Sequence, residues 1–309
     1  MRRLQLIASA ALLGAAINAQ ADNSATIAQT GDDNSATVEQ TGQLNEAVIR
    51  QNGTANVGSV YQHDVAESNL TNLVQVGSDN NAVVYQGPDS HFSSASIYQE
   101  GAGNSTDVEQ TWYANDLQAS SVGDNNRISA IQQGFAGGQA YQIGNNNSII
   151  LDQYGIYHGT TLAVYQVGDD NRASVEQGDA GNIKLAQNGN LNTATISQNT
   201  LFGEVEFNQA GDDNLLVVEQ TGRGNAFSGS STGNGNSVEL VQGFDDSQAS
   251  VVQAGDDNIA SISQLASANE ARINQVGMAN QASITQSAEL MNAVISQTGA
   301  GNMATVVQQ

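Results

Sequence analysis

The sequence contains no cysteine, a single proline and only eight lysine and arginine residues among 309 residues. Without cysteine, no disulfide can stabilise the fold, so stability has to come from backbone pairing and side-chain packing. Acidic residues number 31, and the net charge of −23 at pH 7 disfavours binding to nucleic acid or to an anionic membrane surface. After residue 21, no segment approaches the roughly 20 apolar residues of a membrane-spanning helix. We therefore expect no nucleic-acid partner and no transmembrane segment in the mature chain.

Side chains that perform catalysis or bind metals are also scarce. The three histidines, His63, His91 and His158, lie in or beside enlarged turns and share no phase in the sequence. A metal or catalytic centre needs several ligands that converge on one point, together with groups that hold them. No nucleophile elbow, P-loop or dinucleotide-binding fingerprint occurs between a strand and a helix. We expect no enzymatic activity, no metal site and no cofactor.

An 11-residue repeat runs through most of the chain. Gln29 opens one copy and Gln40 closes it, and Gln40 also opens the next copy. From Gln242 to Gln308 the series continues without a slip. A unit this short forms one strand and one turn, which have nothing to pack on except the next copy. The repeat therefore predicts one elongated domain over residues 22–309.

Alternation within each copy indicates a strand with one buried face. Apolar or amide residues occur at every second position, as in Asn34, Ala36, Val38 and Gln40, and polar residues lie between them. The position held by Val38 is almost always β-branched, which suits a buried pleated surface. The predicted buried apolar column includes Val38, Ile49, Val60, Ile262, Ile273, Ile284, Ile295 and Val306.

Turn-forming residues separate the predicted strands, as in Gly31-Asp32-Asp33. Two copies make one closed rung, with two strands that face each other across a thin interior. The predicted fold is all-β, a flattened β-solenoid of two parallel in-register sheets built from 11-residue strand-turn half-rungs. The 279 positions from Gln29 to Gln308 correspond to about 12–13 rungs and to a rod about 60 Å long at ~4.8 Å per rung.

Asparagine and glutamine recur on the predicted inward face, where an unpaired primary amide would be costly. In a parallel stack, each amide can donate to the amide on one side and accept from the amide on the other. We therefore expect these side chains to form ladders that also contribute to self-assembly. The predicted ladder residues include Gln29, Asn34, Gln40, Asn45, Gln51, Gln275, Asn280, Gln286, Gln297, Asn302 and Gln308.

The first 21 residues have the features of a secretory signal peptide. Met1-Arg2-Arg3 is basic, residues 4–16 are mostly apolar, and Ala19-Gln20-Ala21 forms a small-residue cleavage site. We expect cleavage after Ala21, which leaves six basic residues against 31 acidic ones, a net charge of −25.

Both ends of the repeat region are expected to lack a cap over the terminal strand. Repeats begin at Asn23, directly after the predicted signal peptide, and continue to Gln308. Monomeric solenoids usually cover their end strands with a segment of different sequence. Two uncapped and matching ends favour a head-to-tail contact, which does not close and therefore gives a filament.

Two other classes of repeat protein share some of these sequence features. The acidic turns bear a loose likeness to calcium-binding repeats, and carboxylate oxygens do favour hard cations, but the calcium-roll period is nine residues rather than eleven. A calcium-binding repeat adhesin stays open as the alternative. An ice-binding solenoid needs a flat outward array of threonine, which the outward series Thr37, Val48 and Ser59 does not provide.

The order Gln-x-Gly-x-Gly-Asn-x-Ala-x-x-x-Gln resembles the repeat of the curlins, the subunits of bacterial curli amyloid fibres. The last copy, from Gln297 through Gly299, Gly301 and Asn302 to Gln308, matches this order throughout. Elsewhere aspartate often replaces the second glycine, as at Asp213. Two features depart from the family pattern. The chain is longer than the common subunits, and we expect no separate Gly-rich leader between the signal peptide and the first repeat.

The resemblance implies a secreted fibre subunit with a role in biofilm matrix, surface adhesion and cell aggregation. It implies polymerisation with other copies of the chain at the cell surface, which places the chain in an extracellular fimbrium. The implied partners are a nucleator subunit and the outer-membrane curli secretion channel with its accessory proteins. The regular ends favour the major subunit, and the minor nucleator stays open because both subunits share the repeat.

Overall fold

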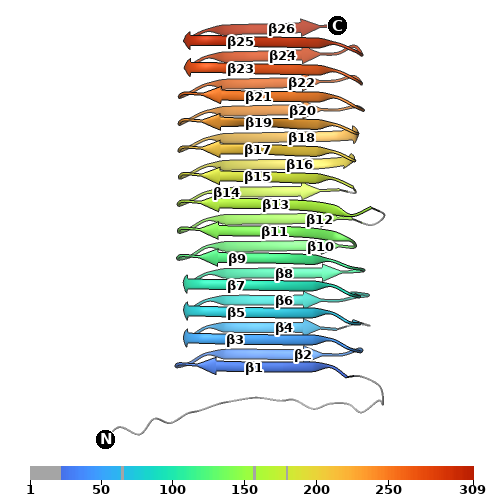
Figure 1. The fold of residues 1–309 in the computed structure, drawn as a ribbon, viewed down its shortest axis with the longest axis vertical. Coiled ribbons are helices and arrows are strands. Elements are labelled where there is room, and N and C mark those ends of the chain that lie inside the picture. Colours follow the sequence, from blue (N-terminus) through green and yellow to red (C-terminus); the bar gives the residue numbers. More distant parts are fainter. Residues whose placement is uncertain (1–21, 64–65, 156–157, 179) are drawn as a thin grey trace, which may run out of the picture.

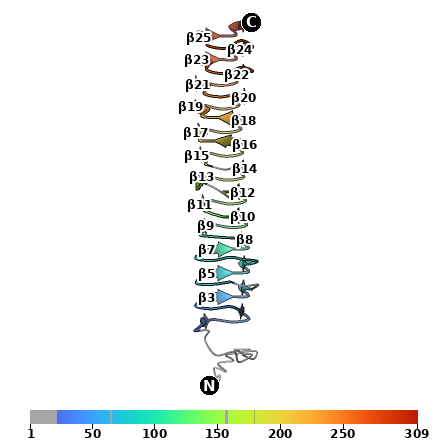
Figure 2. The ribbon, with the colours of Figure 1, turned by 90° about the vertical axis from the view of Figure 1, so that its right-hand side faces the viewer.

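The computed structural model describes residues 22–63, 66–155, 158–178 and 180–309, and the predicted signal peptide lies outside these residues. The described residues form 26 strands joined by turns, without a helix. The strands stack along one axis from β1 to β26 (Figure 1). Figure 2 shows that the rod is thin in the perpendicular direction. Among the described residues, no helix has the length and apolarity needed to cross a membrane.

Two parallel sheets of 13 strands build the rod. The odd sheet contains β1 (Ser24–Thr30), β3 (Glu46–Thr54), β5 (Leu70–Ser78), β7 (Ser94–Ala102), β9 (Asp116–Val122), β11 (Ala136–Ile143), β13 (Thr160–Val167), β15 (Asn182–Asn188), β17 (Glu204–Ala210), β19 (Ala226–Thr232), β21 (Gln248–Ala254), β23 (Glu270–Met278) and β25 (Asn292–Ala300). The even sheet contains β2 (Ser35–Gln40), β4 (Val57–Gln62), β6 (Asn81–Gln86), β8 (Ser105–Thr111), β10 (Arg127–Gln133), β12 (Ser148–Tyr154), β14 (Arg172–Gln177), β16 (Thr193–Leu201), β18 (Leu215–Arg223), β20 (Ser237–Gln242), β22 (Ile259–Gln264), β24 (Gln281–Gln286) and β26 (Met303–Gln308). Each odd strand and the even strand after it form one rung, and we number the rungs 1–13 from the N-terminus. This arrangement confirms the predicted β-solenoid of two parallel sheets.

The rungs stack in register even where their lengths differ. Gln29 aligns with Gln51, which is 22 residues away, and Gln51 aligns with Gln75, which is 24 residues away. The side-chain period of a strand is two, so a slip of one residue would turn the buried face outward. The extra residues lie in turns, and the strands therefore keep their phase.

The interior is a thin layer of apolar side chains from both sheets. The β-branched column predicted from the sequence divides between the sheets, with Ile49 in β3 and Val60 in β4, both fully buried. Val38 and Val306 lie in the first and last rungs and are only partly buried against this core. The other members of the predicted column, Ile262, Ile273, Ile284 and Ile295, are buried to 5% exposure or less.

The two edges of the rod differ. The turns that join an odd strand to the next even strand form what we call the regular edge, which lies on the left in Figure 1. Each of its 13 turns has the order Gly-x-x-Asn, and the leading glycine has a φ between 107° and 132°. The turns that join an even strand to the next odd strand form the variable edge, and all the lengthened turns lie there.

Candidate functional site

Glutamine side chains at the ends of the even strands form an unbroken ladder, which we call the even Gln ladder. Each Nε2 donates to Oε1 of the glutamine in the next rung, at 2.6–3.3 Å. Of the predicted ladder residues, Gln40, Gln286 and Gln308 belong to it. All its side chains except those of the end residues Gln40 and Gln308 are buried, with 1% exposure or less.

A second ladder follows the odd strands and is interrupted twice. Gln29 donates to Gln51 at 2.7 Å, and Gln275 donates to Gln297 at 2.9 Å. Serine replaces glutamine at Ser121 and Ser231, and each serine hydroxyl donates to the glutamine of the next rung, at 3.2 and 2.7 Å. Because a hydroxyl is too short to accept from the preceding glutamine, the ladder loses one hydrogen bond at each serine.

The second hydrogen of the Gln amide joins the two sheets. In the odd ladder, Gln51 Nε2 donates to the carbonyl of Ser35, at the start of an even strand, at 2.9 Å. In the even ladder, Gln264 Nε2 donates to the carbonyl of Gln248, at the start of an odd strand, at 3.0 Å. The amides therefore stabilise stacking along the rod and the contact between its sheets.

Asparagines close every turn of the regular edge and form a third ladder with the opposite direction. Both the backbone N–H and Nδ2 of Asn302 donate to Oδ1 of Asn280, in the rung before it, at 3.1 and 2.8 Å. At the other end, both groups of Asn56 donate to Oδ1 of Asn34 in the same way. In the bonds between amides, Gln side chains donate toward the C-terminal end of the rod and Asn side chains toward the N-terminal end. Asn Nδ2 also donates toward the C-terminal end, to the carbonyl of the turn glycine in the next rung, as Asn280 does to Gly299 at 2.9 Å. The opposite directions of the two ladders cannot be predicted from residue spacing.

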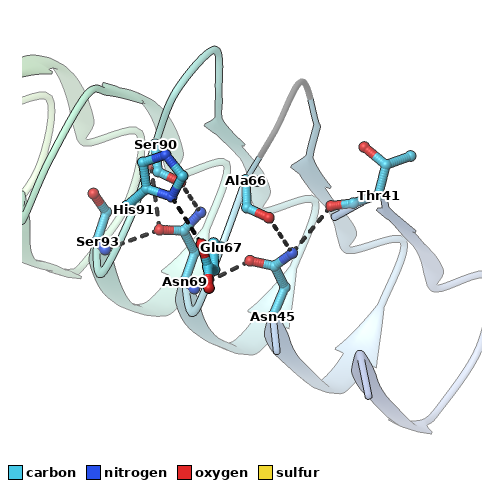
Figure 3. Close-up of polar contacts among 8 residues, drawn as sticks. All are labelled: Thr41, Asn45, Ala66, Glu67, Asn69, Ser90, His91 and Ser93. Atoms are coloured by element: carbon cyan, nitrogen blue, oxygen red, sulfur yellow. Dashed lines mark hydrogen bonds and ion pairs between the residues drawn. The ribbon is translucent and has the colours of Figure 1, made fainter. Parts of the chain in front are cut away.

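Asn45 belongs to a fourth and less regular column on the variable edge (Figure 3). Its Nδ2 donates to the carbonyls of Thr41 and Ala66, both at 3.0 Å, and its Oδ1 accepts from the backbone N–H of Asn69 at 3.1 Å. In the next rung, Asn69 Oδ1 accepts from the backbone N–H of Ser93 at 2.9 Å. Beyond Ser93 the column is irregular: asparagine returns at Asn115, Asn225 and Asn269, and other residues lie between them. The predicted ladder residues therefore lie in four columns rather than in one.

The histidines make separate contacts on the variable edge. His63 Nε2 lies 3.5 Å from Glu39 Oε2. His91 Nδ1 lies 3.7 Å from Glu67 Oε2, and this second pair is drawn in Figure 3. His91 also stacks on Tyr113, and His158 contacts Phe202 edge to face. In the part of the chain that the structure describes, no group of three or more histidine, aspartate or glutamate side chains is arranged to hold a metal ion.

Tyr154 has the most strongly perturbed ionisation among the described residues. Its hydroxyl donates to Asp152 Oδ2 at 2.8 Å, and this hydrogen bond, with partial burial and the charges of Asp152 and Glu176, raises the pKa of Tyr154 to about 12. The protonated phenol is the form that makes the contact. The stabilisation is therefore complete below the ordinary pKa of 10.0 and disappears as the pH rises from 10 toward 12.

We expect an absorbance titration of the tyrosines to show one late step that belongs to Tyr154. In wild-type protein this step falls near pH 12, and Tyr154→Phe removes it while the earlier steps remain. If both proteins complete their titration by about pH 11, the hydrogen bond to Asp152 does not hold the proton.

Both ends of the rod present strand edges and ladder groups without partners in the described part of the chain. At the N-terminal end, β1 is largely exposed and β2 is mostly half-buried. In the described part of the chain, Oε1 of Gln29 and Oε1 of Gln40 accept no ladder hydrogen bond. At the C-terminal end, Gln297 and Gln308 use Nε2 only for backbone carbonyls. One end therefore offers amide oxygens where the other offers amide N–H groups.

Comparison with known families identifies the repeat. A family described as the curlin associated repeat matches residues 21–42, 245–277 and 277–309. No curated protein matches the chain.

Proposed function

Because this chain is a curlin-repeat protein, we propose that it is a structural subunit that assembles head to tail into extracellular amyloid fibres. The observation that carries the proposal is the complementarity of the two ends of the rod. Unpaired strands at each end favour pairing with another chain. A contact between different ends of identical molecules does not close, and it therefore propagates into a fibre.

The direction of the ladders favours head-to-tail contact over the other orientations. In a head-to-tail junction, Gln308 Nε2 can donate to Oε1 of Gln40 in a second copy, as Gln286 donates to Gln308 within one copy. The Asn column is complementary too, since Asn302 Oδ1 can accept from the backbone N–H of Asn34. Head-to-head contact would bring amide oxygens against amide oxygens, which leaves both without donors.

The proposal includes the route and role implied by the family. Residues 1–21 serve as a signal peptide, and residues 22–309 are exported through an outer-membrane curli secretion channel. A nucleator subunit starts polymerisation at the cell surface, and the fibres contribute to biofilm matrix and adhesion. We place the chain as the major subunit because regular rungs lie at both ends, where repeated addition takes place.

Fibre formation tests the proposal directly. Residues 22–309, diluted from denaturant without divalent cations, are expected to form unbranched fibres visible by electron microscopy. A persistent monomer that orders only when calcium is added would overturn the proposal in favour of a calcium-binding repeat adhesin.

Salt is expected to accelerate assembly. Each mature subunit has a net charge of −25, so subunits repel one another at low ionic strength. Raising sodium chloride from about 10 to 150 mM shortens the Debye length from about 30 to 8 Å and should increase the elongation rate several-fold. Elongation on preformed seeds isolates this effect from nucleation, and faster elongation at low salt would contradict the expected role of repulsion.

A further inference from the structure

Carboxylates on the regular edge occur in alternate rungs. The two residues between Gly and Asn include at least one aspartate in rungs 1, 3, 5, 7, 9 and 11, and they include none in the six even-numbered rungs. The acidic residues are Asp32 and Asp33, Asp79, Asp124, Asp169 and Asp170, Asp212 and Asp213, and Asp256 and Asp257. Adjacent rungs lie about 4.8 Å apart, so the acidic turns are separated by about 9.6 Å.

The alternating aspartates belong to a row of hydrogen bonds that joins the turns of successive rungs on the regular edge. In rungs 4 to 10, the residue after the glycine donates its backbone N–H to Oδ1 of the corresponding residue one rung further on, at 2.7–2.9 Å. The accepting side chains are Asp124, Asn145, Asp169, Asn190, Asp212, Asn234 and Asp256. Carboxylate and amide oxygens both accept this bond, but only the amide does so without charge. The strict order Asp, Asn, Asp therefore keeps like charges two rungs apart.

Rung 13 is the one odd-numbered rung whose turn has no carboxylate. Its sequence, Gly299-Ala300-Gly301-Asn302, repeats that of rung 4, Gly101-Ala102-Gly103-Asn104. Within the rod, rung 4 lies next to an acidic turn, and Ala102 N–H donates to Asp124 Oδ1 at 2.8 Å. In a head-to-tail stack, rung 1 of a second copy follows rung 13 directly. Both rungs are odd-numbered, so an acidic turn in rung 13 would lie against the acidic turn of rung 1 without a neutral turn between them.

The glycines of rung 13 have free space that the equivalent glycines lack. A Cβ at Gly277 would lie 1.9 Å from the carbonyl oxygen of Gly299, whereas a Cβ at Gly299 would have Asn302 Nδ2, at 3.5 Å, as its nearest neighbour. Likewise, a Cβ at Gly235 would lie 2.6 Å from Asp257 Oδ1, but one at Gly301 would meet nothing within 4 Å. Rung 13 thus has the glycines that close stacking requires, on a face that nothing in the described chain covers.

We propose that the rung 13 turn receives the rung 1 turn of a second copy, and that the alternation of charge sets this contact. Ala300 N–H donates to Asp32 of the incoming copy, as Ala102 donates to Asp124, and Gly301 leaves room for Asp33. The alternation then continues across the junction without two adjacent acidic turns. This inference rests on the proposed head-to-tail assembly and identifies the residues that recognise each other in it.

Variants at Ala300, which is exposed, test the contact without changing the interior of the rod. Ala300→Asp places a carboxylate against Asp32 and Asp33 of the next copy, and we expect seeded elongation about tenfold slower at low salt, with much of the defect removed at high salt. Ala300→Asn is the matched control, because asparagine already precedes aspartate in the row, and it should elongate at the wild-type rate. Adding Asp32→Asn and Asp33→Asn to Ala300→Asp should restore elongation.

Equal elongation rates for Ala300→Asp and Ala300→Asn would overturn the inference. So would a defect in Ala300→Asp that the two Asn substitutions do not repair. These outcomes differ from a failure of the proposed function, in which wild-type protein itself would form no fibres.

Discussion

Replacement of Gly189 by alanine is expected to disrupt stacking between rungs 8 and 9. The φ of Gly189 is 120°, a region that residues with a side chain rarely adopt, and a Cβ there would lie 2.1 Å from the carbonyl oxygen of Gly211. Neither backbone can yield without losing the hydrogen bond from Gly189 N–H to Val167 or the alignment of the next turn. Strain and overlap together should cost about 3–5 kcal/mol of local stability.

Hydrogen exchange measures this loss where it occurs, because each rung of a solenoid contacts only its neighbours. Strands β15 to β18 should lose protection in Gly189→Ala, while β1 to β6 should keep it. Gly243→Ala is the matched control, since a Cβ at Gly243 would meet only the carbonyl of Gln264, at 3.9 Å. Equal protection in the two variants would show that the column of turn glycines is not required for close stacking.

Gln264→Glu is expected to destabilise the rod at neutral pH although it changes only one atom of the side chain. Gln264 is fully buried, accepts from Gln242 at 2.8 Å, and donates to the carbonyl of Gln248 and to Gln286 Oε1, both at 3.0 Å. Glutamate would present an oxygen to both acceptors and place an unpaired charge in the core. The expected loss at pH 7 is about 3–5 kcal/mol.

The loss of stability in Gln264→Glu is expected to increase with pH. Burial raises the pKa of the introduced carboxyl above the unfolded value of about 4.3, so the loss grows as pH rises above 4.3. Below that value the group is protonated in both states, and its hydroxyl can donate to Gln286. Denaturation of the variant and of wild type at pH 3.5 and 7 measures the difference. Gln281→Glu, which is exposed on the outer face of β24, should show little loss at either pH, and equal behaviour of the two variants would contradict the ladder's role.

The strands and their buried faces could be predicted because each rung repeats the same pattern. A period of two within strands, a β-branched column and a Gly-rich turn at fixed spacing together leave few folds open. Parallel stacking then places like residues next to one another, so amide ladders follow from the sequence. The structure adds that the Gln and Asn ladders donate in opposite directions, which depends on side-chain geometry rather than on spacing.

Differences between the two halves of a rung could not be predicted from an 11-residue count. Glutamine is uninterrupted in the even ladder and is replaced by serine twice in the odd ladder. The two ladders can be told apart only when the sequence is aligned by whole rungs of 22 residues. Phe207 replaces the usual β-branched residue of the buried column and stacks on Phe227. Gly229 beside it leaves room for the ring, since a Cβ there would lie 2.9 Å from the Phe207 ring. Such compensation between rungs becomes visible only when neighbours are known. The alternating aspartates likewise have a meaning only after the rungs are stacked.

The axial rise per subunit in an assembled fibre is the most direct measurement of head-to-tail stacking. If rung 13 of one copy pairs with rung 1 of the next, each subunit contributes its 13 rungs at about 4.8 Å, a rise of about 62 Å. Fibre diffraction should show the 4.8 Å reflection along the fibre axis, and labelled subunits counted per unit length by electron microscopy should match that rise. Fibres whose strands do not stack along the axis, or whose rise per subunit differs clearly from about 62 Å, would contradict a continuous solenoid.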